Sequence, residues 1–294
     1  MKPFDSLPAL VFAFAFAAVP SEGSAAPTIP TDFHQHLGLQ LWSLRAEMAR
    51  NAGLALDRAK AFGFTEVEVA GTGTTPAAQL SAALRARELV PVGGHFGYAQ
   101  LNSDLPGVIR DARALGLQYV VCPILPFKTE AFDEAAAERV AAEFNSWGAS
   151  LRAAGIRFAY HTHGMEFQPT TAGTGETSFD VLVRETQPDL VAFEMDVFWV
   201  VHAGQNPVRL LNKYPNRWAL LHLKDIGLGS DTGLTAPPAG PADNVAVGTG
   251  QIDWPSVLRA AQRIGVKYYF IEDETADPLR NIPLSLSYLR GLKL

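Results

Sequence analysis

The chain has almost no cysteine, and this absence limits how the fold can be stabilised. Its 294 residues contain one cysteine, Cys122, within the apolar run YVVCP. A single thiol cannot form a disulfide within the chain, and a structural zinc site built from cysteines is excluded as well. Stability must therefore come from an apolar core, in which we expect Cys122 to be a small buried hydrophobe.

The sequence also lacks an excess of positive charge. It has 24 lysine and arginine residues against 30 aspartate and glutamate residues, for a formal net charge of −6 at pH 7. Binding to a phosphate backbone requires a basic face, so nucleic acid is excluded as a partner. A phosphate-binding P-loop is missing too, because the segment GTGTT at Gly71 lacks the lysine of that motif.

Long apolar runs are scarce, and the one at the N-terminus has the features of an export signal. Lys2 precedes an apolar run over 7–19, and small residues follow up to Ala26. The run is too short to span a bilayer comfortably, so we predict a signal peptide over 1–25 and no membrane contact after its cleavage. An extension over 26–36 would precede the folded domain, and the mature protein would be periplasmic or secreted.

The rest of the sequence alternates short apolar strands with amphipathic helices. Phrases such as ALGLQYVV and RIGVKYYF, in which a glycine follows a helix just before a strand, are typical of parallel α/β proteins. Eight such units predict a single (β/α)8 TIM barrel over 37–294. A doubly wound open sheet is the alternative, but it requires a glycine-rich turn where this chain has SLRAEMARNAG. The predicted strands begin at Leu37, Glu66, Val90, Tyr119, Arg157, Val191, Trp218 and Tyr268.

The fifth to eighth predicted strands end in side chains that can bind metal or transfer protons. In a barrel these strand ends share one rim, where active sites are built. Taken alone, such a histidine could be a core residue and such an aspartate a helix cap, but their equivalent positions in successive units indicate one site. Nitrogen and oxygen ligands without thiolate favour Mn²⁺, Zn²⁺, Co²⁺ or Fe²⁺. The candidate ligands are His161 or Glu166, Asp196, His222 and Glu272.

Two long segments follow strand ends on this rim. They cover 164–178 after the fifth strand and 226–251, rich in glycine and proline, after the seventh. Segments of this length in a compact domain are usually lids or binding loops. We therefore expect both to border the active site.

Several phrases closely resemble the sugar phosphate isomerase/epimerase family of xylose isomerase-like TIM barrels. They are YHTHGMEF, DVFWVVHAGQNP, NRWALLHLKD, GTGQIDWPSVL and YYFIEDETADPL. The resemblance covers the chain from about Leu37 to Leu294. It implies one divalent metal ion, Mn²⁺ or a similar cation, held by a Glu, Asp, His, Glu set. Asp196, His222 and Glu272 match the last three ligands, whereas the fifth-strand ligand is either His161 or Glu166.

The resemblance implies a sugar or keto-sugar isomerase/epimerase that removes a proton next to a carbonyl through a metal-stabilised enediolate. Glu272 is the expected base, and His163 or Glu166 the second acid/base. Lys224 would polarise the developing oxyanion or would form a surface salt bridge with Asp225. Trp42, Phe96, Trp199 and His95 are expected to form the walls of the site and to offer aromatic faces to the sugar. For His95, contact with the substrate and a purely structural role are equally compatible with the sequence.

Two other functions remain open from the sequence. An exported protein would meet free sugars or 3-keto-glycosides rather than sugar phosphates, and a 3-keto-glycoside lyase or hydratase would begin with the same proton abstraction. A non-catalytic secreted sugar-binding barrel is the alternative of another class. In each case the partner is a small carbohydrate, and a homo-oligomer is compatible with the sequence.

Overall fold

The computed structural model describes residues 32–294 except positions 72, 74, 129–130, 171–172 and 174. The predicted signal peptide over 1–25 and residues 26–31 of the extension lie outside this part. The rest of the extension belongs to the folded unit, because Phe33 in the 3-10 helix η1 (Phe33–His36) is fully buried against the ring of Tyr269.

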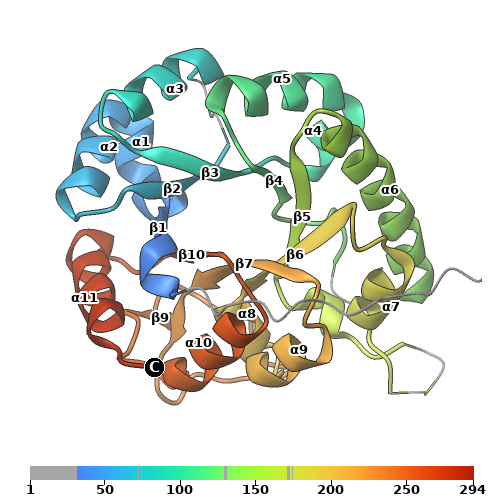
Figure 1. The fold of residues 1–294 in the computed structure, drawn as a ribbon. Coiled ribbons are helices and arrows are strands. Elements are labelled where there is room, and N and C mark those ends of the chain that lie inside the picture. Colours follow the sequence, from blue (N-terminus) through green and yellow to red (C-terminus); the bar gives the residue numbers. More distant parts are fainter. Residues whose placement is uncertain (1–31, 72, 74, 129–130, 171–172, 174) are drawn as a thin grey trace, which may run out of the picture.

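Eight parallel strands close into a barrel with helices around it (Figure 1), which confirms the predicted (β/α)8 fold and rules out an open sheet. Around the barrel the strands follow the order β1-β10-β7-β6-β5-β4-β3-β2, so each lies beside its neighbours in the chain. Their bounds are β1 (Leu37–Gln40), β2 (Glu66–Val69), β3 (Val90–His95), β4 (Tyr119–Cys122), β5 (Arg157–His161), β6 (Val191–Asp196), β7 (Trp218–Leu223) and β10 (Tyr268–Ile271).

The helices cover the outside of the barrel (Figure 1), and polar residues define where several of them begin. Thr177 and Asp180 form a capping box at α7, and Asp253 caps α10 just before Trp254 and Pro255. No helix in the described ranges is long and apolar enough to cross a membrane. The helices are η2 (Leu41–Leu44), α1 (Arg45–Arg50), α2 (Ala52–Ala61), α3 (Ala77–Arg85), α4 (Tyr98–Ser103), α5 (Leu105–Leu115), α6 (Glu134–Ala153), η4 (Met165–Phe167), α7 (Ser178–Glu185), α8 (Val197–His202), α9 (Pro207–Lys213), α10 (Trp254–Arg263) and α11 (Pro278–Gly291).

The barrel interior changes from apolar to polar along its length. Towards the strand starts, small and aromatic side chains such as Tyr119, Ala192 and Tyr268 form an inner core. A larger apolar cluster lies between the strands and the helices, and it includes the fully buried Cys122. Towards the strand ends, the buried residues are polar instead: Gln40, Glu68, His161, Glu194, Asp196 and His222. The fold therefore concentrates buried polar groups at the rim where the active site was expected.

Asp225 organises the long segment that follows β7. The segment begins with a two-stranded antiparallel sheet of β8 (Asp225–Ile226) and β9 (Asn244–Val245). Oδ2 of Asp225 accepts hydrogen bonds from the Gly248 N–H at 2.9 Å and from the indole N–H of Trp254 at 2.8 Å. Because the carboxylate is fully buried, these donors replace the water it loses on folding. Asp225 thus joins the rim segment to helix α10.

We expect the Asp225→Ala variant to lose about 2 to 3 kcal/mol of free energy of unfolding, because several buried N–H donors lose their acceptor. Thermal or urea unfolding measures this change. Asp231→Ala, an exposed aspartate of the same segment, is the control and should change stability by less than about 0.5 kcal/mol. Equal stability of the two variants would contradict the role of Asp225.

Candidate metal centre and active site

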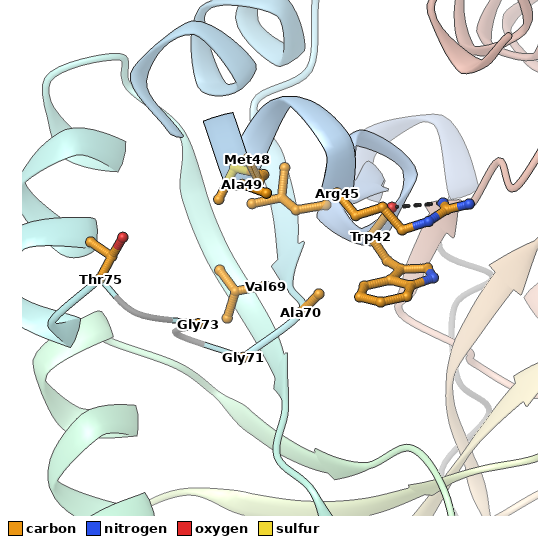
Figure 2. Close-up of a pocket in the computed structure, with 10 residues that line it drawn as sticks. Trp42, Arg45, Met48, Ala49, Val69, Ala70, Gly71, Gly73 and Thr75 are labelled. Carbon is orange, nitrogen blue, oxygen red and sulfur yellow. Dashed lines mark hydrogen bonds between the residues drawn. The ribbon is translucent and has the colours of Figure 1, made fainter. Parts of the chain in front are cut away.

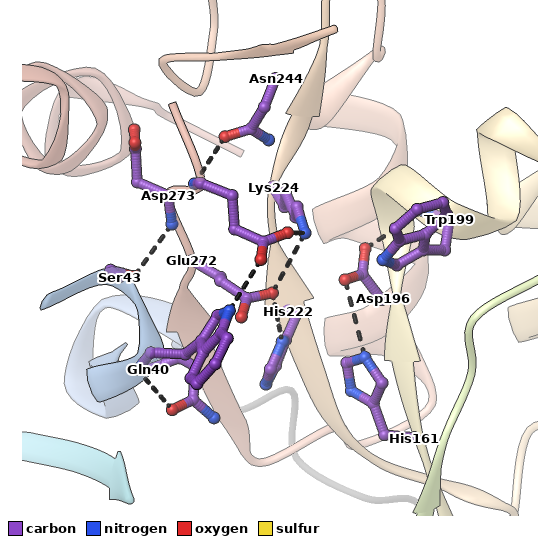
Figure 3. A network of polar contacts seen from close by, with 12 residues as sticks. Gln40, Ser43, His161, Asp196, Trp199, His222, Lys224, Asn244, Glu272 and Asp273 are labelled. Atoms are coloured by element: carbon purple, nitrogen blue, oxygen red, sulfur yellow. Dashed lines mark hydrogen bonds and ion pairs between the residues drawn. The ribbon is translucent and has the colours of Figure 1, made fainter. Parts of the chain in front are cut away.

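Three predicted ligands lie together at the carboxyl end of the barrel. Asp196 ends β6, His222 lies beside it in the register of β7, and Glu272 follows β10 directly. Each of these residues offers a ligand atom, and the three atoms lie within 4.8 Å of one another (Figure 3). His161 at the end of β5 extends the set, because its Nε2 is 3.7 Å from Oδ2 of Asp196.

Each of the two imidazoles contacts a rim carboxylate and a deeper carboxylate, and Nε2 of His222 also lies 3.3 Å from Oε2 of Glu194. His222 has Nδ1 3.2 Å from Oε2 of Glu272 and Nε2 2.7 Å from Oε2 of Glu68. His161 has Nδ1 2.8 Å from Oε2 of Glu194, while its Nε2 faces Asp196. Histidine ligands commonly donate their second ring N–H to a carboxylate, which fixes their orientation and tautomer. Glu68 and Glu194 are placed to do this for His222 and His161.

The deeper carboxylates were missed in the sequence, although a signal for them was present. Glu68 lies within EVEV and Glu194 within FEMD, so each is a charged residue inside a strand that is otherwise buried. A buried carboxylate requires a partner, which makes such a residue a candidate for the barrel interior. Their partners could not be inferred, because those lie on other strands.

His95 links the two deeper carboxylates. Its Nε2 is 3.2 Å from Oε2 of both Glu68 and Glu194, and Gln40 donates to the same Glu68 oxygen at 2.8 Å. Burial alone would lower the pKa of His95, but the negative charge of Glu68 and the hydrogen bond to Glu194 outweigh it and raise the pKa to about 9. At neutral pH His95 is therefore a cation between two anions, and it also lines the cavity above them.

The ligand atoms of His95, His161, Glu194 and His222 form a second close group, but the rim set fits a cation better. Oε2 of Glu194 already accepts from imidazoles at 2.8 and 3.2 Å. Oδ2 of Asp196 is buried without a hydrogen-bond partner among the described residues, and so is Oε1 of Glu194. Asp196, however, belongs to the set that includes Glu272, which lines the cavity. An orphaned carboxylate oxygen beside two imidazoles and a second carboxylate is the donor set that a divalent ion of the Mn²⁺ or Zn²⁺ type requires.

The pKa values at the rim follow from burial and from neighbouring charges. Burial raises the pKa of Asp196 to about 7, since the nearby charge of Lys224 only partly opposes it. Burial would also raise the pKa of Glu272, but Lys224 and His222 hold it well below its usual range. Burial lowers the pKa of His161 to about 4, assisted by the charge of His222. At neutral pH Glu272 is therefore an anion and His161 a neutral imidazole with a free lone pair.

A cavity of about 640 Å³ opens over this set. His163 lines it as a neutral imidazole, since burial above all, followed by the neighbouring His161 and the positive charge of Lys224, lowers its pKa well below the usual range. Its Nδ1 has no hydrogen-bond partner among the described residues, and its ring centroid lies 5.6 Å from that of Trp199. The other lining residues include Trp42, Ala70, Gly71, His95, His161, Trp199, Lys224, Glu272 and Glu274.

Lys224 is a buried cation at the wall of the cavity. Its Nζ lies 3.5 Å from Oε2 of Glu272 and forms a closer ion pair with Glu274, so it pairs with these carboxylates and not with Asp225. The ammonium also lies 5.4 Å from the centre of the Trp199 ring. Glu274 was absent from the sequence-based site, since its acidic neighbours in IEDETADP gave no reason to prefer it.

Two residues predicted for the site point elsewhere. Phe96 is 2% exposed and belongs to the apolar cluster between strands and helices, so it is not among the residues that line the cavity. Glu166 is fully buried in the turn after β5, where its Oε1 accepts from the backbone N–H of His163 at 3.0 Å. The structure therefore groups His161, and not Glu166, with the other candidate ligands.

The family assignment follows from a match that spans most of the chain. Residues 56–292 match the family described as xylose isomerase-like TIM barrel. The chain belongs to this family. This agrees with the resemblance read from the strand-end phrases.

Individual relatives are more distant. An inosose dehydratase from Lacticaseibacillus casei is 26% identical over 161 residues, which are 50% of this chain and 49% of the relative. This chain thus spans about half the length of that curated relative. The structure of a sugar phosphate isomerase/epimerase from Parabacteroides distasonis matches with a TM-score of 0.70 at 24% identity, and the match covers 92% of this chain and 98% of that protein's chain. The structure of the IOLI protein with a bound zinc atom matches with a TM-score of 0.63 at 15% identity, and the match covers 87% of this chain and 95% of that chain. The two structures show a shared fold.

We expect Glu194→Gln to weaken binding of Mn²⁺ or Zn²⁺ by about 10- to 100-fold, because His161 loses the anion that fixes its ring. Isothermal titration calorimetry with each metal measures the change. Glu138→Gln on the exposed surface of α6 is the control and should bind metal as the unaltered protein does. Unchanged metal affinity in Glu194→Gln would contradict the role of Glu194 in orienting the ring of His161.

We expect Glu166→Gln to change how stability depends on pH. Burial raises the folded-state pKa of Glu166 to about 7, above its ordinary value of 4.5. The folded protein keeps this proton up to a higher pH than the unfolded chain does. The contribution of the carboxyl group to stability is therefore complete below pH 4.5 and is lost as the pH rises through 7. The variant should therefore gain up to about 3 kcal/mol over the unaltered protein between pH 4.5 and pH 8. Urea unfolding of both metal-free proteins across this range measures it, and parallel curves would contradict the assignment.

Proposed function

We propose that this protein is a divalent-metal-dependent enzyme that removes a proton next to the carbonyl group of a sugar or keto-sugar, as an isomerase or epimerase. The observation that carries the proposal is the convergence of His161, Asp196, His222 and Glu272 beneath one cavity. Membership of the xylose isomerase-like family and the fold shared with a sugar phosphate isomerase/epimerase support it.

The four rim residues would hold the cation. When bound, it would supply a Lewis acid that stabilises negative charge on a substrate oxygen, which makes the neighbouring C–H bond more acidic. The donor set suits Mn²⁺ and also Zn²⁺, Co²⁺ or Fe²⁺, and a structural neighbour described with bound zinc supports a divalent ion.

Proton transfer would be the task of the chain's own residues. Glu272 is ionised, lines the cavity and is proposed as the base, with Lys224 beside it to stabilise the anionic form. His163 is neutral and has an unpartnered nitrogen, so it is proposed as the second acid/base, which would take up the proton of a substrate hydroxyl group and then return it to the substrate. His95 and Trp199 would contact the sugar, and Trp42 would offer it an aromatic face.

A lyase is the second candidate, and the curated matches favour it specifically. Curated proteins that are 26 to 35% identical to this chain over the matched residues are described as inosose dehydratases, for example that of Lacticaseibacillus casei at 26%. Dehydration begins with the same abstraction next to a carbonyl. His163 would then donate its proton to a departing hydroxyl or alkoxyl group instead of to carbon. A 3-keto-glycoside lyase or hydratase and an isomerase thus differ only after the first step.

We further propose that the protein acts after export, on a free carbohydrate. The apolar run over 7–19 supports a signal peptide over 1–25, which would direct the protein to the periplasm or the exterior. Outside the cytoplasm, unphosphorylated sugars and glycosides are the accessible carbohydrates.

We expect the unaltered protein to hold one divalent ion and to catalyse entry of solvent deuterium into a free or 3-keto sugar. Elemental mass spectrometry and proton NMR measure the two quantities. His163→Gln should keep its metal but lose about 10²- to 10⁴-fold in turnover, whereas Glu272→Gln should lose exchange altogether while it still folds. Glu138→Gln is the control for both.

Metal without exchange on any sugar would argue against the enzyme and in favour of a sugar-binding barrel. Absence of metal from the unaltered protein, with Asp196→Ala and His222→Ala indistinguishable from it, would overturn the metal site itself.

A further inference from the structure

A second cavity of about 370 Å³, whose lining residues Figure 2 shows, adjoins the active-site cavity. The two cavities share Trp42, Ala70, Gly71 and Gly73 in their walls, so they are continuous around the indole of Trp42. A molecule bound over the rim carboxylates could therefore extend past Trp42 into the second cavity without any movement of the backbone.

Trp42 is held as a fixed partition between the two cavities. Its indole N–H donates to Oε1 of Glu274 at 2.8 Å, and the guanidinium of Arg45 lies 5.3 Å from the centre of its ring. Arg45 also donates to the Trp42 carbonyl oxygen at 3.1 Å. Although the ring is fixed on these sides, Trp42 remains 44% exposed, which leaves aromatic surface free for a ligand.

The second cavity has an apolar floor. The buried side chains of Leu41 and Val69 line it. Met48 and Ala49 of helix α1 line it as well, and Figure 2 shows both together with Val69. The described lining contains no carboxylate, and Arg45 is its charged residue. A second sugar ring would need several hydrogen-bond partners here, whereas an apolar ring would be satisfied by these side chains, including the adaptable thioether of Met48.

The size of the cavity agrees with an aromatic ligand. A protein cavity of roughly 150 Å³ can accommodate benzene. The second cavity is larger than this, so it has room for a substituted aromatic ring. A methyl group or a hydroxyl group on the sugar would leave most of it filled with water.

We propose that the second cavity binds an apolar aromatic substituent of the sugar that reacts over the rim. The substrate class would then be a glycoside with an aromatic aglycone, in contrast to a free monosaccharide. This inference rests on the proposed function for the position of the sugar. The indole of Trp42 contacts both the sugar and the aglycone, and the side chains of α1 cover the aglycone from outside.

The test compares phenyl β-D-glucopyranoside with methyl β-D-glucopyranoside as ligands of the metal-loaded protein, by isothermal titration calorimetry. The phenyl glycoside should bind about tenfold more tightly, as expected for partial burial of its ring. In Ala49→Trp the new side chain should fill the cavity and abolish this preference, while methyl glucoside binds as before. Ala49 is exposed on α1, so the substitution leaves the core intact.

Met48→Ala provides an independent variant, because it removes contact area without filling the cavity; it should reduce the preference severalfold. Equal binding of the two glycosides by the unaltered protein would overturn the proposal, as would a preference that survives in Ala49→Trp.

Solvent deuterium exchange into 3-keto-glucose, measured in parallel, separates this inference from the proposed function. Exchange without any preference for the phenyl glycoside overturns the subsite and leaves the enzyme in place. A phenyl preference lost in Ala49→Trp, but without exchange, supports the subsite and overturns the reaction.

Discussion

The burial of several carboxylates at one end of the barrel is the constraint on which the site depends. Glu68, Glu194 and Asp196 are fully buried, and Glu272 is 8% exposed. An isolated buried carboxylate is strongly destabilising, so each must lie against a cation, a hydrogen-bond donor or a metal. Histidines from three other strands supply most of these partners, and the polar interior is stable only as a complete set.

This arrangement connects the depth of the barrel to its rim. His222 spans the two levels, with one ring nitrogen beside Glu68 and the other beside Glu272. His161 does the same between Glu194 and Asp196. The deeper carboxylates therefore orient the imidazoles of the candidate ligand set, although they do not line the cavity themselves.

The segment after β7 supports the opposite side of the cavity. Asp225 gathers backbone donors of this segment, and in β9 the side chain of Asn244 accepts from the backbone N–H of Glu274 at 2.8 Å. Glu274 in turn binds Lys224 and the indole of Trp42 (Figure 3 shows Lys224 and Asn244 in this network). The segment over 226–251, expected as a lid or binding loop, is thus tied to the wall of the cavity.

The sequence by itself determined the barrel and three of the candidate metal ligands. Short apolar strands that each follow a helix can bury both faces only in a parallel α/β fold, and the strand ends then fall on one rim, which placed Asp196, His222 and Glu272 together. The tertiary structure decided what local patterns do not contain: His161 rather than Glu166 faces the ligand set, Phe96 turns into the core, and Glu68 becomes the partner of His222 across 154 positions of the chain. Periodicity fixes which way a residue points from its own strand, whereas barrel closure alone brings side chains from distant strands within bonding distance.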